Sequence, residues 1–230
     1  MGIMNDAERD YNELVQRAFR AMAPIYDLMT IPIRRLRDEA VNFAGPEEGS
    51  AVLDVATGTG DQALAFARRG FRVTGIDLTD AMLERAVRKQ GSEKVRFELG
   101  DATCLRFPTN AFDVVSVSFA LHDMPPTIRE RVLREMTRVA KPGGTILIVD
   151  YGLPRNRLGR FLVYRLVDLY EGETYREFIR SDLHALLAKV GISLTGERIA
   201  VLGAAKVWKG RIVSMPIVTS QVKGRARGGN

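Results

Sequence analysis

The stretch AVLDVATGTGD (residues 51–61) decides the fold of this chain. Its first five residues form a short apolar run, which is typical of a buried strand, and two glycines follow in the next turn. Glycine permits a tight turn, a close approach of the backbone to a ligand and free amide groups at the start of a helix. The stretch therefore predicts a strand, a ligand-binding turn and a helix in succession.

The pattern repeats downstream. The apolar run at 112–120 contains almost no polar residue, as expected of a strand buried on both faces. Strands that alternate with helices predict right-handed βαβ units and a parallel sheet. Beyond the strand at 51–55, the expected strands lie at 71–77, 94–101, 112–120 and 145–152, and the expected helices lie at 61–70, 80–91 and from Pro125 to the KPGG sequence at 141–144.

Both ends of the chain depart from this alternation. Residues 1–45 are expected to be helical, because apolar residues recur at helical spacing until Pro24 breaks the run. After a helix near 175–190, the strand-like runs 192–202 and 204–213 predict an antiparallel hairpin that turns at Gly203. The predicted fold class is α/β, a Rossmann-like, doubly wound and mostly parallel seven-stranded sheet with an antiparallel C-terminal hairpin.

This order of elements predicts the organisation of the chain. We expect an N-terminal helical cap at 1–45 and a ligand-binding domain at 46–213, with a pocket-forming insert at about 153–175. A basic tail follows at 214–230. Six Lys and Arg residues and no acid lie from Lys206 onward, and they account for the whole net charge of +6. We expect the tail to be disordered and solubilising, with contact to anionic lipid or nucleic acid as the alternative.

Composition narrows the class of protein. No uncharged apolar run approaches the roughly 18 residues that a membrane span requires. The acidic start of the chain does not resemble a secretory signal. A single cysteine, Cys104, fits a reducing compartment and is expected to be a small buried residue rather than a catalytic thiol. We expect a cytoplasmic protein without a metal site.

Three aspartates follow successive strands, where an open parallel sheet binds its ligand. Asp54 suits a ligand with an ammonium group and would repel a pyrophosphate. Asp77 can accept both hydroxyls of a ribose, and Asp101 can accept from the amino group of an adenine. Each one alone could be an ordinary strand-end residue. Together with the glycines they favour an adenosine-containing cation over NAD, although Gly58-x-Gly60-x-x-Ala63 also passes as a dinucleotide fingerprint.

At these motifs the chain resembles the class I S-adenosylmethionine-dependent methyltransferases. VLDVATGTGD, TGIDLT and GDA look like their first three motifs, and REMTRVAKPGGTILIVDYG is similar to their signature after the fourth strand. The resemblance covers residues 14–213. Within the class, FRAMAPIYDLM followed by VLDVATGTGD looks most like the ubiquinone/menaquinone biosynthesis C-methyltransferase family.

The resemblance implies S-adenosylmethionine as cofactor. It implies that Asp54 and the backbone from Gly58 to Gly60 hold the methionyl part, while Asp77 binds the ribose. Tyr26 would close over the cofactor from the N-terminal helices, or it would only anchor the cap. The implied cofactor-binding residues are Tyr26, Asp54, Thr57, Gly58, Gly60, Asp77, Leu78, Asp101, Ala102 and Phe119.

One segment departs from the quinone family. That family typically has Gly-Leu-Arg-Asn after the fourth strand, whereas this chain reads Ala-Leu-His-Asp-Met-Pro at 120–125. The Leu-His-Asp sequence looks like plant-type O-methyltransferases, whose matching histidine is the catalytic base. We expect His122 to be the base, the alternative being a histidine of the pocket wall. Asp123 is expected either to orient the imidazole of His122 or to cap the next helix. The other histidine, His184, is expected outside the pocket.

The acceptor is expected to be a small, aromatic, apolar molecule such as a prenylated quinol. The insert is rich in arginine and apolar residues, so it is either an amphipathic helix at an anionic membrane surface or an ordinary packed helix. Its tyrosines Tyr164 and Tyr170, together with Tyr175, are candidates for the acceptor pocket. The competing functions are a nucleic-acid methyltransferase, a non-catalytic cofactor-binding subunit and an NAD-dependent dehydrogenase.

Overall fold

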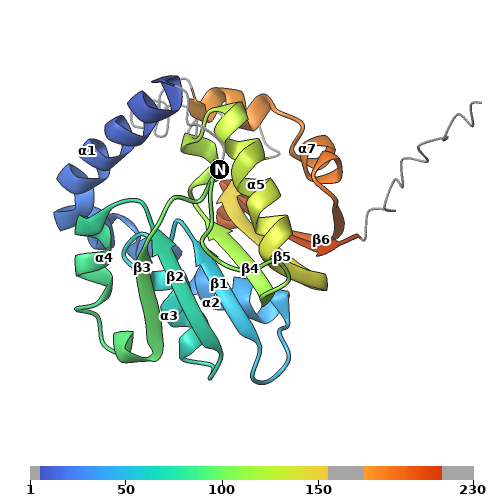
Figure 1. Ribbon diagram of the computed structural model, residues 1–230, viewed down its shortest axis with the longest axis horizontal. Coiled ribbons are helices and arrows are strands. Elements are labelled where there is room, and N and C mark those ends of the chain that lie inside the picture. Colours follow the sequence, from blue (N-terminus) through green and yellow to red (C-terminus); the bar gives the residue numbers. More distant parts are fainter. Residues whose placement is uncertain (1–5, 155–173, 214–230) are drawn as a thin grey trace, which may run out of the picture.

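A seven-stranded sheet forms the centre of the molecule in the computed structural model, which describes residues 6–154 and 174–213 (Figure 1). The strand order is β3-β2-β1-β4-β5-β7-β6. Neighbouring strands from β3 to β5 pair in parallel, whereas β7 pairs antiparallel with both β5 and β6. The predicted fold class is confirmed. The strands are β1 (Ala51–Val55), β2 (Arg72–Asp77), β3 (Val95–Leu99), β4 (Phe112–Ser118), β5 (Ala140–Tyr151), β6 (Ile192–Ala200) and β7 (Ala205–Ile212).

Helices cover both faces of this sheet and form two apolar cores. One core lies between the sheet, α5 and α7, and the other lies between the sheet, α2 and α3. Burial on both faces explains why β4 and β5 are almost continuously apolar. The helices are α1 (Asp6–Met29), α2 (Arg34–Ala44), α3 (Asp61–Ala67), α4 (Asp80–Ala86), α5 (Pro126–Val139) and α7 (Leu183–Lys189), with short 3₁₀ turns η1 (Ile31–Ile33), η2 (Ser92–Lys94), η3 (Leu121–Asp123) and η4 (Val201–Gly203).

The predicted helix near 175–190 is two helical segments instead of one. Residues 174–180 are helical, and α7 begins only at Leu183. Ser181 closes the first segment with hydrogen bonds to the carbonyls of Glu177 and Phe178. Asp182 then caps α7, because its side chain accepts from the amide of Ala185. A helix end at Ser181 and a helix start at Asp182 therefore interrupt the segment, although its apolar residues keep helical spacing throughout.

The boundary between α5 and β5 also differs from the prediction. The helix ends at Val139, and the KPGG sequence lies inside β5 rather than at the helix end. Gly143 adopts a φ of 70°, and the pairing with β4 is irregular near Phe112. The glycines therefore form the irregular beginning of strand β5. In sequence, glycines at this position look the same as the glycines that end a helix, which explains the different prediction.

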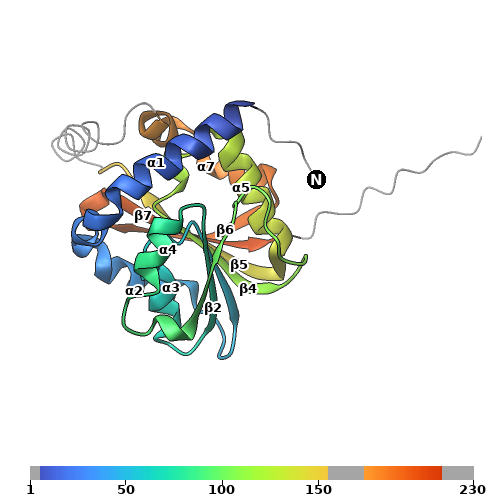
Figure 2. The same cartoon turned by 60° about the vertical axis from the view of Figure 1, so that its left-hand side comes forward.

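The N-terminal helices have two different environments. Helix α2 packs on the sheet, where Ala40 and Val41 are part of the second core. Helix α1 instead lies across the end of the sheet, above the carboxyl ends of the central strands (Figures 1 and 2). It continues through Pro24 to Met29, so the expectation that Pro24 breaks the helix is wrong. The one missing amide hydrogen bond is tolerated inside a helix that other contacts hold in place.

Three observations concern residues outside the pocket. Cys104 is exposed, which corrects its expected burial, because it lies in a surface turn after β3. His184 is exposed on α7 and lies 3.2 Å from Glu197 Oε2, away from the pocket as expected. Within residues 6–154 and 174–213, no helix is long and apolar enough to cross a membrane.

Candidate active site

An inner pocket lies where the parallel strands end, beneath helix α1. Its floor comes from the turn after β1 and from the ends of β2, β3 and β4, and its roof comes from α1. This is the position at which an open α/β sheet binds its ligand. Seven of the ten residues expected to bind the cofactor line this pocket, namely Tyr26, Gly58, Asp77, Leu78, Asp101, Ala102 and Phe119.

The glycine turn after β1 uses a backbone conformation that favours glycine. Gly58 and Gly60 adopt φ angles of 56° and 80°, and Ala56 between the strand and the glycines has a φ of 52°. A methyl group on Gly58 would lie 3.9 Å from Cε1 of Tyr26, so this glycine faces the pocket and its roof. A Cβ on Gly60 would lie 2.8 Å from Cζ of Phe97. Gly60 therefore leaves space for Phe97 beside its α-carbon, while its expected backbone contact with the cofactor stays a prediction.

Asp77 fixes the glycine turn and faces the pocket at the same time. Its Oδ2 accepts from the Gly58 amide and its Oδ1 accepts from the Thr79 amide, each at 2.8 Å. The residue is 9% exposed, and burial raises the pKa of its carboxyl even though these amides lower it. Each carboxylate oxygen has a second lone pair, so the group still accepts hydrogen bonds from the pocket.

Asp54 lies below the turn and not on the pocket wall. Its two oxygens accept from the hydroxyls of Thr57 and Ser116, both at 2.6 Å, and the residue is 1% exposed. Burial raises the pKa of Asp54 to about 6. The structure therefore places both Asp54 and Thr57 in the support of the turn, and this corrects their expected place in direct contact with the cofactor.

Asp101 lines the pocket after β3 and connects to the cap. Its Oδ1 accepts from the amide and the hydroxyl of Thr103, both at 2.7 Å. Its Oδ2 lies 3.4 Å from the side-chain nitrogen of Asn12 in α1. Asn12 also lines the pocket but was not among the predicted residues. A polar residue on an amphipathic helix has no sequence signal that distinguishes a pocket contact from solvent.

A second, outer pocket opens beside the first and has a volume of about 650 Å³. The two pockets share part of their walls, including Tyr26 of the cap, Phe119 at the end of β4 and Asp123 in η3. Phe119 adopts a φ of 51°, a strained conformation for a residue with a side chain, and such strain is concentrated at functional sites. Phe119 and Asp123 therefore lie where two adjoining pockets meet.

His122 lines the outer pocket near this junction, as the sequence analysis expected of a base. Its Nδ1 lies 2.7 Å from Oδ1 of Asp150, at the end of β5, and its Nε2 lies 3.5 Å from Oδ1 of Asp123. Asp150 is fully buried and also accepts from the amides of Leu121 and Tyr151. Asp150 is therefore the nearer carboxylate and is placed to orient the imidazole, whereas the expected partner Asp123 lies near the opposite ring nitrogen.

The sequence carried a signal for Asp150 that the sequence analysis did not use. Asp150 ends a buried apolar strand, just as Asp54 and Asp77 do. The carboxyl ends of parallel strands meet at one edge of the sheet, so a fourth aspartate at such an end belongs to the same region. Because β5 follows η3 by a whole helix, its closeness to His122 depends on sheet order rather than on sequence spacing.

Aromatic rings surround the imidazole. The ring centroids of Tyr151 and His122 are 4.6 Å apart, and Tyr175 packs edge-on against Tyr151 at 5.3 Å. Tyr151 lines the outer pocket, whereas Tyr175 is fully buried behind it. The expected place of Tyr175 on the pocket wall is therefore corrected. Tyr164 and Tyr170 lie outside the described residues.

The comparisons with known proteins agree with this architecture. A methyltransferase domain family model matches residues 52–144. The ubiquinone/menaquinone biosynthesis C-methyltransferase UbiE of Geobacter sulfurreducens is 30% identical over 227 residues, with 86% of this chain and 88% of the relative covered. UbiE of Azotobacter vinelandii is 36% identical over 156 residues, which cover 63% of this chain and 61% of that protein.

A solved structure supports the fold independently. A SAM-dependent methyltransferase from Aquifex aeolicus superposes with a TM-score of 0.65 at 21% identity, covering 83% of this chain and 98% of that one. The relatives and the domain model together indicate an enzyme that uses S-adenosylmethionine. The chain therefore belongs to the class I S-adenosylmethionine-dependent methyltransferases and, within them, lies close to the UbiE family.

Proposed function

We propose that this enzyme methylates a carbon or an oxygen of a small, quinol-like aromatic acceptor, and that His122 is the general base. The observation that carries the proposal is the junction of the two pockets. The inner pocket ends at Phe119 and Asp123, and the outer pocket begins there with His122 on its wall. A reaction that joins two bound molecules needs them side by side with a base within reach of one.

The residues of the inner pocket fit S-adenosylmethionine. Asp77 presents a buried carboxylate that accepts two ribose hydroxyls, and Asp101 presents a carboxylate suited to the adenine amino group. Leu78 and Ala102 supply the apolar walls between which a purine packs. When bound, the cofactor supplies a methyl group on a positively charged sulfur. Tyr26 and Phe119 offer aromatic faces that favour such a cation.

The pair of His122 and Asp150 suits proton removal from the acceptor. The buried carboxylate of Asp150 accepts the proton on Nδ1, so the neutral imidazole presents Nε2 as the acceptor. Nε2 would take the hydroxyl proton of the acceptor, and the oxygen or ring carbon activated in this way would receive the methyl group that the bound cofactor supplies. For a ring carbon, the proton on that carbon would be lost afterwards and the hydroxyl restored, and in both cases Nε2 becomes protonated. The resulting imidazolium lies between two carboxylates, those of Asp150 and Asp123, which stabilise it.

The outer pocket favours an apolar acceptor. Its wall includes Leu14, Met22, Met29 and Ile33 from the N-terminal segment, and Leu14 and Met29 are 66% and 40% exposed. Apolar side chains that reach from a pocket to the surface suit a substrate with a long hydrocarbon tail. The UbiE relatives are named as ubiquinone/menaquinone biosynthesis C-methyltransferases, which supports an acceptor of the quinol class.

A methyl-transfer screen tests this function. Wild-type enzyme with radiolabelled S-adenosylmethionine is offered hydroxylated benzoquinols and naphthoquinols with and without a prenyl chain, simple phenols, amines and transfer RNA. We expect label on the prenylated quinols above all others, and the position of the label distinguishes carbon from oxygen. Label on RNA or on amines alone would contradict the proposal.

A further inference from the structure

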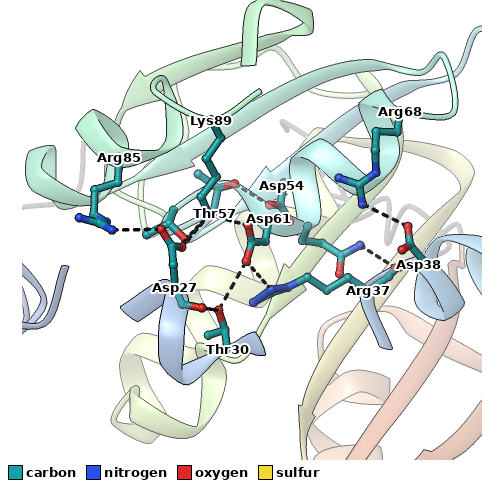
Figure 3. Close-up of polar contacts among 12 residues, drawn as sticks. Asp27, Thr30, Arg37, Asp38, Asp54, Thr57, Asp61, Arg68, Arg85 and Lys89 are labelled. Carbon is teal, nitrogen blue, oxygen red and sulfur yellow. Dashed lines mark hydrogen bonds and ion pairs between the residues drawn. The ribbon is translucent and has the colours of Figure 1, made fainter. Parts of the chain in front are cut away.

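Asp27, the residue after Tyr26, lies at the centre of a polar network (Figure 3). Asp27 does not line the inner pocket, so a direct contact with the cofactor does not explain this network. Asp27, near the end of α1, accepts from the Thr59 hydroxyl and from the Lys89 ammonium through Oδ1, both at 2.6 Å. Its Oδ2 lies 3.3 Å from Nη2 of Arg85. Thr59 lies between the two glycines of the turn, so Asp27 joins the end of the cap helix directly to that turn.

A second layer of charges holds these partners in place. Lys89 Nζ also lies 2.5 Å from Oδ1 of Asp61, and the Arg37 guanidinium lies 3.0 Å from Oδ2 of Asp61 (Figure 3). The Lys89 ammonium additionally donates to the Thr59 hydroxyl at 2.9 Å. Burial opposes ionisation of Asp27, but the bonds from Lys89, Thr59 and Arg85 outweigh it and lower the pKa of Asp27. The carboxylate is therefore charged at neutral pH.

Helix α1 depends on such contacts more than the other helices do. Among its side chains at 9–29, which the structure describes, only Ala23 is buried. The helix lies over a pocket instead of a packed core, and Pro24 removes one of its own hydrogen bonds two residues before Tyr26. Thr30 closes the last turn through hydrogen bonds to the carbonyls of Tyr26 and Asp27. The Asp27 carboxylate adds a restraint from outside the helix, beside the ring that covers Gly58.

We propose that Asp27 is a positioning residue for the cofactor, which it does not touch: it clamps the last turn of α1 to Thr59 and Lys89 and so holds Tyr26 over the glycine turn. The proposal rests on the cofactor occupying the inner pocket. The clamp couples closure of the cap to the conformation of the turn, because one hydroxyl, that of Thr59, belongs to the turn and bonds to the cap.

Calorimetric titration with S-adenosylmethionine tests the clamp in four variants. We expect Asp27→Ala to raise the Kd about tenfold, the effect of losing charge-assisted hydrogen bonds. Thr59→Val removes the hydroxyl and is expected to raise the Kd, whereas Thr59→Ser keeps the hydroxyl and is expected to bind the cofactor with the wild-type Kd. The matched control is Asp80→Ala, which removes an exposed ion pair between α4 and Arg20 of the same helix and leaves the Kd within about twofold.

A double-mutant cycle separates positioning from general destabilisation. If Asp27 acts through Tyr26, the double variant Tyr26→Ala/Asp27→Ala binds the cofactor as weakly as Tyr26→Ala alone. Additive losses of affinity, or a wild-type Kd for Asp27→Ala, would overturn the proposal. Asp77→Ala in the same series checks the cofactor site itself. If Asp77→Ala binds the cofactor more weakly and Asp27→Ala binds it with the wild-type Kd, only the positioning role of Asp27 is contradicted. If Asp77→Ala binds the cofactor with the wild-type Kd, the proposed cofactor site itself is contradicted.

Discussion

The floor and the roof of the inner pocket are held by opposite kinds of interaction. At the sheet end, Asp77 and Asp150 are buried and accept hydrogen bonds from backbone amides, while Asp54 binds two hydroxyls. In the roof, Asp27 pairs with the side chains of Lys89 and Arg85, and Arg20 pairs with the half-exposed Asp80 at the start of α4. Backbone amides have fixed positions in the sheet, whereas long cationic side chains are flexible and screened by salt.

This difference separates preorganisation from closure. The floor has its binding geometry before a ligand arrives, because its carboxylates are fixed by the strands and the glycine turn. The roof consists of one helix with a single buried side chain among residues 9–29. We therefore expect substitutions in the floor to affect chemistry and affinity strongly, and substitutions of exposed roof charges to have small, salt-dependent effects.

The largest expected effect is on turnover, at His122 in the outer pocket. His122→Ala removes the base, and Asp150→Asn no longer holds the imidazole in the required tautomer, so each lowers kcat by roughly 10² to 10⁴. The affinity for S-adenosylmethionine stays at the wild-type value, because neither side chain lines the inner pocket. Single-turnover rates alongside calorimetry check both statements. Wild-type turnover in His122→Ala would remove the general-base role.

An intermediate effect is expected on stability at Asp54. The pKa of about 6 in the folded state exceeds the value near 3.9 in an unfolded chain, so the folded state binds the proton more tightly. The stability that this proton supplies is complete below pH 4 and is lost as the pH rises to about 6. The loss is about 3 kcal/mol at roughly 1.4 kcal/mol for each pH unit between the two values.

Urea unfolding of the ligand-free protein measures this effect. Asp54→Asn keeps an oxygen for one hydroxyl and does not titrate. We expect its free energy of unfolding, relative to wild type, to increase by about 3 kcal/mol between pH 4 and pH 7. A difference between the two proteins that is independent of pH would show that Asp54 is not perturbed by its burial.

The smallest expected effect is at the exposed ion pair of the roof. Asp80→Ala removes the contact with Arg20, whose side chain is 62% exposed, and we expect only a slight loss of thermal stability. Thermal unfolding at low and high salt is the measurement, and the loss should disappear at about 1 M salt. A large loss of stability that persists in high salt would show that the roof is built like the floor.

The fold and the floor of the pocket were accessible from the sequence for a physical reason. Strand, turn and helix signals are local, and residues at the carboxyl ends of parallel strands converge whatever the order of the strands. Asp77 and Asp101 were predicted on this basis and line the pocket. The same reasoning did not distinguish Asp54 from the aspartates that line the pocket. The Asp54 side chain supports the turn from below, because the packing around a single residue decides whether its side chain faces the pocket or the core.

The roof and the base were less accessible because their contacts are distant in sequence. Asp27 meets Thr59 and Lys89 only after α1 has crossed the sheet end, and Asp150 meets His122 only through the pairing of β4 with β5. No spacing rule connects these positions. Asp123 was the expected partner of His122 because it is adjacent in sequence, and the sheet supplied a nearer carboxylate.

The central claim is that the carboxylate of Asp77 grips the cofactor in the inner pocket. Calorimetric titration of wild-type enzyme, Asp77→Ala and Asp77→Asn with S-adenosylmethionine tests it most directly, with circular dichroism to verify folding. Asp77→Ala loses both acceptors for the ribose hydroxyls and is expected to bind more weakly by about 1–3 kcal/mol, whereas Asp77→Asn keeps one acceptor oxygen and is expected to show a smaller loss. An affinity equal to that of the wild type in a folded Asp77 variant would contradict the assignment of the pocket.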